Sequence, residues 1–385
     1  MAGNTVLVLG GGTGGIVAAH RLRRELGRDD RVVVLERDPV YRFAPSFLWV
    51  LTGARRPEQI SADLGRLRRR GIEFIEAEAR AIDTDARRVE TSNGPLAYER
   101  VVVALGAELA PDLLAGFAEA AHSVYTLDGA LDAASALEAF DGGRVAVLVS
   151  RLPYKCPAAP YETALLAEAL LRKRGVRERS SVEVYTPEPL PMPTAGPETG
   201  EAVRGLLESR GIDFHPERMV ERIEPGTREL LFEGGERVPF DLLLGIPPHR
   251  APAVVRASPL AGPSGFIPVD RATLATAVEG VDAIGDVTSI AIAGGRFLPK
   301  AGVFAHGQAE VVAKRIAAEL AGRTPSARFD GKGACFLEMG DGSAAYASGD
   351  FYAEPRAHVR MRRPGRHWHL GKVAFERYWL WRWFR

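Results

Sequence analysis

The feature that most constrains this chain is a cluster of glycines directly after its first apolar segment. Residues 5–9 read TVLVL, a short aliphatic run typical of a buried parallel strand. The sequence continues as GGGTGG over residues 10–15, and residues 14–27 have the pattern of a helix. Gly-x-Gly-x-x-Gly at a strand-to-helix turn is typical of a dinucleotide-binding βαβ unit. The chain is therefore expected to begin with a Rossmann-like domain.

The residues of this turn have separate tasks in the predicted site. Gly10 allows the tight turn, Gly12 lets the backbone approach a pyrophosphate, and Gly15 lets helix and strand pack closely. Thr13 and Gly14 lie at the start of the helix, where free amide groups and the helix dipole attract an anion.

An acidic residue at the end of the second predicted strand identifies the nucleotide more closely. The strand reads RVVVLERD over residues 31–38, and its Glu36 lies 21 residues after Gly15. A carboxylate at that spacing bonds ribose hydroxyls. It disfavours a 2′-phosphate, so FAD or NAD fits better than NADP; Arg37 is placed in the same binding segment.

Three later segments favour FAD. Residues 98–109 place a strand before an Ala-Leu-Gly sequence that resembles the Ala-Thr-Gly segment of flavoproteins with two dinucleotide domains. Residues 276–290 carry a Gly-Asp pair, whose aspartate contacts FAD in that superfamily, and a helix over 302–321 would direct its N-terminus at the flavin. The residues concerned are Ala104, Gly106, Gly285, Asp286 and Gly302.

The second half of the chain repeats the strand and the helix without the glycines. A strand is expected at 144–149 and a helix at 160–174. Between them stand Pro153, Lys155, Cys156 and Pro157, with Pro160 at the helix start, and prolines cannot form the same amide cradle. The sequence thus predicts a degenerate second domain and argues against NADH as electron donor.

The two cysteines are the basis of a family resemblance. Cys156 lies in a turn before a helix, a position that lowers the pKa of a thiol. The segment CPAAPYE (156–162) and the distant GACFLE (333–338) resemble sulfide:quinone oxidoreductases and flavocytochrome c sulfide dehydrogenases. Further similar segments are YRFAPSFLWVLTG (41–53), LPK (298–300) and the C-terminal GKVAFERYWLWRWF (371–384).

The resemblance implies a flavoenzyme that passes electrons from sulfide through FAD to a quinone. Cys156 and Cys335 would form its redox-active pair, and Glu162 would accept a proton. Pro45 would flank the flavin, and Lys300 would hold negative charge beside it. FAD would be bound noncovalently, because residues 41–46 lack the cysteine that binds it in the flavocytochrome. The chain departs from some relatives in having no third cysteine over 107–130 and no histidine over 187–197.

The last residues predict a contact with a membrane surface. Four of the five tryptophans lie within residues 368–385, and the segment 356–385 has nine Lys or Arg and one acid. Aromatic and basic residues favour the interface and anionic headgroups. We expect a peripheral anchor; the alternatives are packing against the core or a dimer contact. No leader or long apolar span is visible, so the cytoplasmic face is the default expectation.

These elements predict an α/β fold with two Rossmann-like dinucleotide-binding domains of the glutathione-reductase type, the second degenerate, plus a C-terminal membrane-associating segment. The expected boundaries are 1–105 and 241–325 for the FAD domain, 106–240 for the second domain and 326–385 for the C-terminal segment. Residues 241–248 are expected as a strand of the FAD domain. Further helices are expected at 58–70 and 198–210.

Composition limits the alternatives. The 385 residues have a net charge of +1, which gives no indication of nucleic-acid binding, and two cysteines 179 residues apart predict no metal site. A homo-oligomer is left open. Two other functions remain as hypotheses: a type II NADH:quinone dehydrogenase, and a flavin- or persulfide-binding redox protein without turnover.

Overall fold

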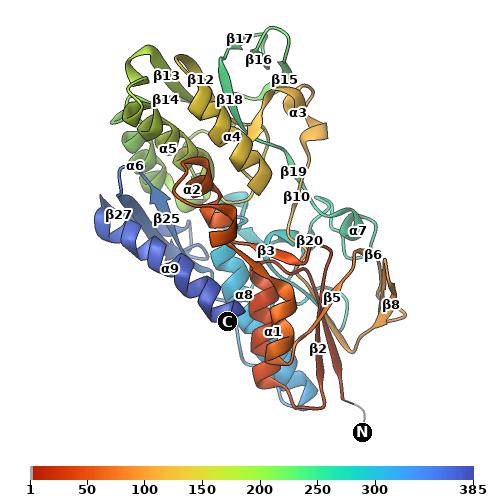
Figure 1. Cartoon of the computed structure of the whole chain (residues 1–385). Helices are drawn as coiled ribbons and strands as arrows, with labels where there is room; N and C mark the ends of the chain where they lie inside the picture. Colours follow the sequence, from red (N-terminus) through yellow and green to blue (C-terminus); the bar gives the residue numbers. More distant parts are fainter. Residues whose placement is uncertain (1–2) are drawn as a thin grey trace.

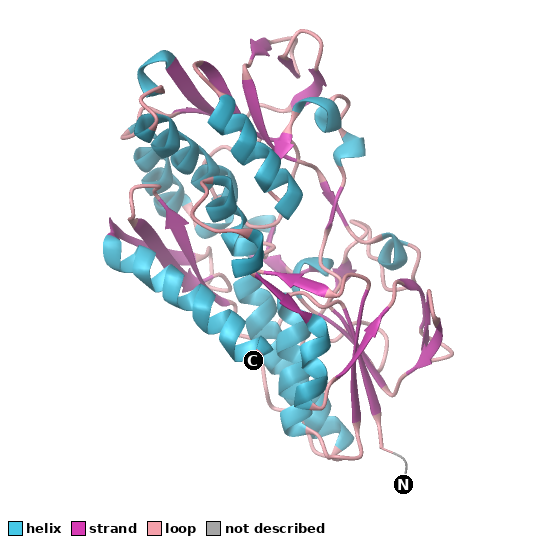
Figure 2. Ribbon diagram, in the orientation of Figure 1, coloured by secondary structure: helices cyan, strands magenta, loops and turns pink. Residues whose placement is uncertain are grey.

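The computed structural model describes residues 3–385, and two parallel sheets dominate it (Figures 1 and 2). The first has the order β21-β9-β1-β2-β5 and the second β11-β18-β12-β13-β14, with all neighbouring strands parallel. The strands of the first sheet are β1 (Thr5–Leu9), β2 (Arg31–Glu36), β5 (Glu73–Glu76), β9 (Arg100–Val103) and β21 (Val281–Ala283). Those of the second are β11 (His122–Ser123), β12 (Gly143–Val149), β13 (Ser180–Tyr185), β14 (Asp213–His215) and β18 (Leu242–Ile246). The predicted fold of two Rossmann-like units is confirmed.

One strand that was expected in the first sheet belongs to the second sheet. Residues 241–248 were predicted to return the chain to the FAD domain, but β18 pairs with β11 and β12 in the second sheet. Its apolar residues alone gave no indication of the sheet, because buried strands of both sheets have the same composition. The chain crosses between the sheets at a short antiparallel pair, β10 (Glu108–Leu109) and β19 (His249–Arg250).

Alternating burial explains why β1 lies in the middle of its sheet. Val6 and Val8 face one core cluster together with residues of helices α1 and α8, while Leu7 and Leu9 face a second cluster on the other side. Successive strand residues point to opposite faces, so a strand without polar residues must be covered on both. Helices α1 and α8 pack together over the first face.

Four of the five helices expected by range are present as α1, α5, α6 and α8. The helices of the described residues are α1 (Thr13–Glu25), α2 (Phe47–Leu51), α3 (Phe117–Ala120), α4 (Leu127–Ala139), α5 (Ala159–Lys173), α6 (Pro197–Glu208), α7 (Ala253–Arg256), α8 (Gly302–Leu320) and α9 (Arg366–Phe384). The helix expected at 58–70 is wrong, because two 3-10 turns flank strand β4 (Ser61–Asp63) there. β4 pairs with β3 (Val40–Arg42), and the Asp63 side chain caps the second turn by accepting a bond from the Gly65 amide at 2.7 Å.

Three antiparallel meanders complete the structure. They are β6 (Ala79–Asp83), β7 (Arg88–Thr91) and β8 (Gly94–Ala97); β15 (Val220–Glu224), β16 (Glu229–Phe232) and β17 (Arg237–Pro239); and β25 (Lys332–Glu338), β26 (Ala344–Asp350) and β27 (His358–Gly365). Two further short pairs are β20 (Ile267–Pro268) with β22 (Thr288–Ser289), and β23 (Ala291–Ile292) with β24 (Arg296–Phe297). Among the described residues, no helix is long and apolar enough to cross a membrane.

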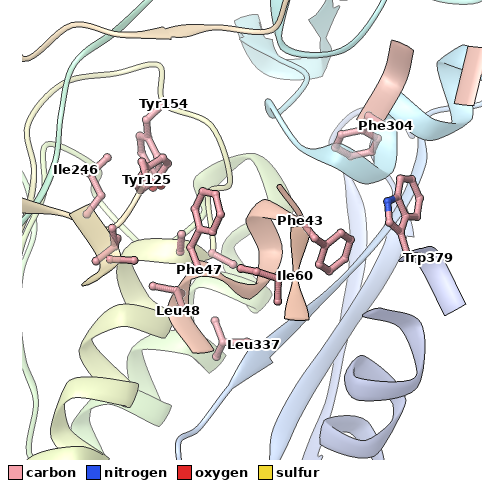
Figure 3. Packing of buried hydrophobic residues seen from close by; sticks show 14 of the residues in the cluster. Phe43, Phe47, Leu48, Ile60, Tyr125, Tyr154, Ile246, Phe304, Leu337 and Trp379 are labelled. Carbon is pink, nitrogen blue, oxygen red and sulfur yellow. The ribbon is translucent and has the colours of Figure 1, made fainter. Parts of the chain in front are cut away.

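One continuous core cluster joins both sheets and the C-terminal helix. In Figure 3, Phe47 and Leu48 of α2 lie between Tyr125 of the second domain and Phe43 of the first. On the other side of Phe43 stands Trp379 of α9, with ring centroids 6.0 Å apart. The two Rossmann units are therefore packed through α2 rather than linked only by their crossing strands.

Candidate active site

The glycine turn forms an open cradle at the carboxyl end of β1. A Cβ atom at Gly10 would lie 2.4 Å from the Ala104 carbonyl oxygen, and one at Gly15 would lie 1.9 Å from that of Gly10. At Gly12 the same atom would meet nothing within 4 Å, and this residue is exposed. Two glycines of the motif are thus required by packing, and the third leaves room for a ligand.

Helix α1 begins at this cradle without a cap of its own. Its N-cap residue Gly12 has no capping side chain, and its first turn has no acidic residue. Thr13 is half-buried beside Gly302, where α8 begins, also without a side-chain cap or an early acid. Two helix N-termini therefore offer amide groups and positive partial charge to the same region.

The predicted ribose and ribityl carboxylates lie at neighbouring strand ends. Glu36 accepts bonds from the amides of Gly11 and Arg37, both at 2.8 Å, while the Arg37 side chain is exposed. Asp286 lies just after β21, near Gly14, whose Cβ would stand 3.2 Å from Ile284. Burial raises the pKa of Asp286, which Lys155 and Lys300 lower in part, and no hydrogen bond to its carboxylate is formed within residues 3–385.

The remaining predicted binding residues lie around the carboxyl ends of the strands of the first sheet. Gly106 follows β9 with φ +70°, and Gly285 has φ +73° and donates its amide to the Gln308 side chain at 2.7 Å. Pro45 lies exposed in a 3-10 turn before α2. The structure thus brings most of the predicted cofactor residues to one edge of the first sheet.

Lys300 connects this edge to the cysteine loop. Its ammonium group donates to the carbonyl oxygens of Asp286 at 2.6 Å and Thr288 at 3.1 Å. Its own carbonyl accepts a bond from the Cys156 amide at 2.7 Å. Burial lowers the pKa of Lys300 to about 8, against the charge of Asp286, and the side chain is buried instead of lying in solvent.

The Cys156 loop is held in a conformation that is rare for a side-chain-bearing residue. Cys156 has φ +56°, in the left-handed region. Its carbonyl accepts bonds from the Ala159 amide at 2.9 Å and from the Tyr125 hydroxyl at 3.3 Å. Backbone conformations of this kind persist where surrounding contacts enforce them and cluster at functional sites.

Cys335 reaches the same region from the C-terminal meander. It lies on β25 opposite Ala347 of β26, beside a narrow apolar hollow that Ala158 of the cysteine loop also lines. Both thiols are free. Charge on Cys335 affects the pKa of Cys156, and charges on Glu162 and Lys372 affect the pKa of both thiols, so these four groups form one cluster.

The prediction of a lowered thiol pKa is wrong for the ligand-free protein. Burial raises the pKa of Cys156 well above its usual value, and the charges of Cys335 and Glu162 raise it further. Cys335 is an exposed residue, yet desolvation by the surrounding atoms raises the pKa of its thiol to about 11. Desolvation of both sulfurs thus outweighs the effect of the α5 N-terminus and of the Lys372 ammonium.

A buried ion-pair network joins Glu162 to the C-terminal helix. The Lys372 ammonium of α9 donates to Glu162 Oε1 at 2.5 Å, and His369 Nδ1 lies 2.8 Å from Glu338 Oε2 on β25. Burial raises the pKa of Glu162, although Lys372 opposes this. Burial alone would lower the pKa of Lys372, but the charges of Glu162 and Glu338 raise it. The sequence predicted Glu162 only, because its partners are more than 170 residues away.

A second buried carboxylate supports the cysteine loop and was also missed. Glu188 Oε2 accepts bonds from the hydroxyls of Tyr154 at 2.9 Å, Thr186 at 3.2 Å and Tyr161. Burial raises the pKa of Glu188, and the three hydroxyl groups lower it in part. Tyr154 precedes Cys156 by two residues, so the carboxylate is connected to the loop backbone.

The C-terminal helix packs against the protein along one side. Glu376 accepts bonds from Arg55 Nε at 2.8 Å and from the Ser46 hydroxyl, and Trp379 and Trp383 are buried. The other side exposes Leu370, Tyr378 and Trp381, with exposed fractions of 64%, 56% and 52%. The alternative of packing against the core is therefore correct for the inner side of the helix.

These features fit a dinucleotide with a pyrophosphate group. The cradle is open at Gly12, two uncapped helix N-termini converge on it, and the Asp286 carboxylate has no hydrogen-bond partner there. The pattern of the pyridine nucleotide-disulphide oxidoreductases matches residues 4–309. The chain belongs to this family. It is an FAD-dependent oxidoreductase, since the family and its sulfide:quinone relatives imply that flavin.

Known proteins that are similar to this chain agree with the predicted resemblance. The chain is 29% identical to the sulfide-quinone reductase of Aquifex aeolicus, over 98% of this chain and 90% of that protein. It is 26% identical to the mitochondrial sulfide:quinone oxidoreductase of Mus musculus, over 91% and 79%. A solved Aquifex aeolicus sulfide:quinone oxidoreductase superposes with a TM-score of 0.89 at 28% identity, covering 99% of this chain and 91% of that one.

Proposed function

We propose that this chain oxidises sulfide through Cys156 and Cys335 and passes the electrons through noncovalently bound FAD to a quinone. The observation that supports this most is the electrostatic effect of Cys335 on the pKa of Cys156. Cys156 comes from the second Rossmann unit and Cys335 from the C-terminal meander, and Glu162 and Lys372 act electrostatically on both. A pair of thiols beside a dinucleotide cradle is suited to two-electron chemistry.

The thiol pair performs the first step in its disulfide form, which the two free thiols reach by losing two protons and two electrons, with bound flavin as the electron acceptor. A hydrosulfide anion attacks one sulfur, a new S–S bond forms, and the bond between the cysteines breaks. The electron pair of the broken bond leaves on the other cysteine as a thiolate, so one cysteine carries a persulfide. A second hydrosulfide takes the outer sulfur of the persulfide and leaves two thiols. FAD, when bound, would supply the two-electron acceptor that restores the disulfide and the donor for the quinone.

At this step Lys372 stabilises negative charge and Glu162 accepts a proton. The Lys372 ammonium stabilises a thiolate, because its charge lowers the pKa of both thiols. Glu162, whose pKa is raised by burial, accepts the proton that hydrosulfide carries after it has bound to sulfur. Within the FAD domain, Gly12 and the N-termini of α1 and α8 would hold the pyrophosphate, and Asp286 would accept a bond from a hydroxyl of the cofactor.

An anaerobic titration tests the function. Sulfide should bleach the flavin absorbance, and a short-chain quinone should restore it. NADH should leave the flavin oxidised, because Pro153, Cys156 and Pro157 occupy the turn where a nicotinamide dinucleotide would need glycines. Bleaching by NADH would support a type II NADH:quinone dehydrogenase instead, and bleaching by neither would support a redox protein without turnover.

We also propose that the outer face of α9 contacts a membrane surface, where quinone is dissolved. This face combines the exposed Leu370, Tyr378 and Trp381 with the exposed Arg366 and Arg377. Removal of residues 368–385 is unsuitable as a test, because it would also remove Lys372 and Glu376 from the site.

Surface substitutions test the membrane contact without this complication. The triple variant Leu370→Ser, Tyr378→Ser and Trp381→Ser should bind anionic vesicles several-fold more weakly in sedimentation, and its sulfide-dependent bleaching in detergent should be unchanged. Leu113→Ser, an equally exposed apolar residue before α3, serves as control. Equal vesicle binding of the triple variant and the native protein would contradict the contact.

A further inference from the structure

His249 is a buried residue that neither the sequence patterns nor the proposed chemistry uses. It follows β18 at the point where the chain leaves the second sheet, and it pairs with Leu109 at the crossing between the two domains. Its exposed fraction is 8%. Its position therefore places an imidazole between the two Rossmann units, with little access to solvent.

The hydrogen bonding of the ring fixes its tautomer. Nδ1 lies 2.9 Å from the Pro247 carbonyl oxygen. A carbonyl can only accept, so Nδ1 carries the proton and Nε2 presents a lone pair. Burial and the charges of Lys155 and Lys300 together lower the pKa of His249 to about 3, against the hydrogen bond to Pro247, so the ring is neutral at physiological pH.

Nε2 of this ring has no hydrogen-bond partner anywhere in the described part of the chain. A buried acceptor without a partner costs free energy, so such groups in native proteins usually meet a ligand or an ordered water. The missing partner must be a hydrogen-bond donor, because Nε2 can only accept.

The surroundings of His249 belong to the site described above. Its ring stands edge-on to Tyr125, with centroids 5.4 Å apart, and the Tyr125 hydroxyl donates to the Cys156 carbonyl. Lys155 and Lys300 act on it electrostatically, and Lys300 in turn holds the backbone of Asp286. His249 thus lies where the cysteine loop meets the Gly-Asp segment of the FAD domain.

From this placement we propose that His249 is a cofactor-binding residue whose Nε2 accepts a hydrogen bond from an N–H or O–H group of the flavin half of FAD. This inference rests on the proposed flavin site. A flavin carries both a ring N–H and ribityl hydroxyl groups, so it supplies the donor that the protein lacks. Lys155 and Lys300 cannot supply it, since neither ammonium group bonds Nε2.

FAD titration of the apoprotein tests the inference. His249→Phe removes the acceptor and should weaken FAD binding about threefold to tenfold, as expected for one lost hydrogen bond. His249→Gln, whose side-chain oxygen can accept, should recover part of the affinity. The visible absorption bands of the bound flavin should shift in His249→Phe and return towards the native spectrum in His249→Gln.

His215→Phe is the matched control. Nε2 of His215 also forms no hydrogen bond and lies 3.6 Å from Glu183 Oε2, but the residue is on β14, at the outer edge of the second sheet. Its FAD affinity and flavin spectrum should equal those of the native protein. A structural role for His249 would lower the Tm of the apoprotein and the holoprotein equally; a binding role reduces the increase in Tm that FAD causes.

Native FAD affinity and an unchanged spectrum in His249→Phe would overturn the inference while the flavin site stands. Failure of the native protein to bind FAD at all would overturn the proposed function as well. FAD binding by the native protein distinguishes the two failures.

Discussion

The two Rossmann units place different chemistry at the same strand-to-helix turn. Three residues separate β1 from α1, and they include the glycines of an open cradle. Nine residues separate β12 from α5, and they include Pro153, Cys156 and Pro157. Both turns lie at the carboxyl end of a central strand, which is where ligands of such sheets bind. One frame therefore holds an open glycine cradle in the first unit and presents a thiol in the second.

Of all the substitutions, loss of either cysteine sulfur should reduce the reaction with sulfide most. Cys156→Ser and Cys335→Ser should each reduce sulfide-dependent flavin bleaching at least about 1,000-fold, because thiol–disulfide exchange requires both sulfurs. Stopped-flow absorbance measures this. Both variants should retain FAD and be reduced normally by dithionite; full sulfide turnover in either one would refute the thiol pair.

The raised pKa of the Cys335 thiol predicts how this residue reacts with an alkylating reagent. In Cys156→Ser, labelling of Cys335 by iodoacetamide should accelerate with pH up to about 11, since only the thiolate reacts. Each pH unit below the pKa changes the thiolate fraction about tenfold, so the rate should rise about 100-fold from pH 7 to pH 9. Fast labelling at pH 7 that does not depend on pH would contradict a desolvated thiol.

Two alanine variants separate the binding and packing roles of the glycine turn. Gly12→Ala should leave the Tm of the apoprotein unchanged, because its Cβ meets nothing within 4 Å, and should weaken FAD binding about tenfold or more. Gly15→Ala should lower the Tm itself, because its Cβ would lie 1.9 Å from a carbonyl oxygen.

Gly205→Ala on α6, where a Cβ also has open space, is the control for alanine substitution. Equal FAD affinity of Gly12→Ala and the native protein would show that the cradle does not receive the pyrophosphate.

The smallest effect is expected when Glu188, the carboxylate that supports the Cys156 loop, loses one hydrogen bond. Tyr154→Phe removes one donor to Glu188 and should cost about 1 kcal/mol of stability. It should also change the alkylation rate of Cys156 by a few fold, measured in Cys335→Ser, because Tyr154 connects Glu188 to the loop. Tyr185→Phe, whose hydroxyl bonds Glu183 in the same domain, should leave that rate unchanged. Equal rates of Cys156 alkylation in both variants would show that Glu188 does not position Cys156.

The sequence predicted the features that depend on local patterns. The glycine turn, the helices at α1, α5, α6 and α8, and the family resemblance all follow from short segments whose spacing has a physical meaning. The error at residues 58–70 has a local cause, since Asp63 caps a tight turn and Gly71 ends it in a left-handed conformation with φ +73°. Basic and apolar residues at helical spacing concealed those two signals.

Features that depend on distant segments could not be predicted in the same way. Lys372, Glu338 and His369 approach Glu162 only after β25 and α9 have folded onto α5. The position of β18 depends on the pairing of whole strands. The raised pKa of Cys156 depends on burial, which outweighs the helix N-terminus that the sequence does reveal.

Helix α9 carries Lys372 and Glu376 on its inner side and Trp381 on its outer side. A helix with its side chains is only about 10 Å across. Anything that tilts or turns this helix from outside must also displace the Lys372 ammonium group from the thiols. A fluorescent reporter attached at position 381 would therefore respond to movements of Lys372 beside the sulfurs. A surface that immobilises the helix would also keep Lys372 in place.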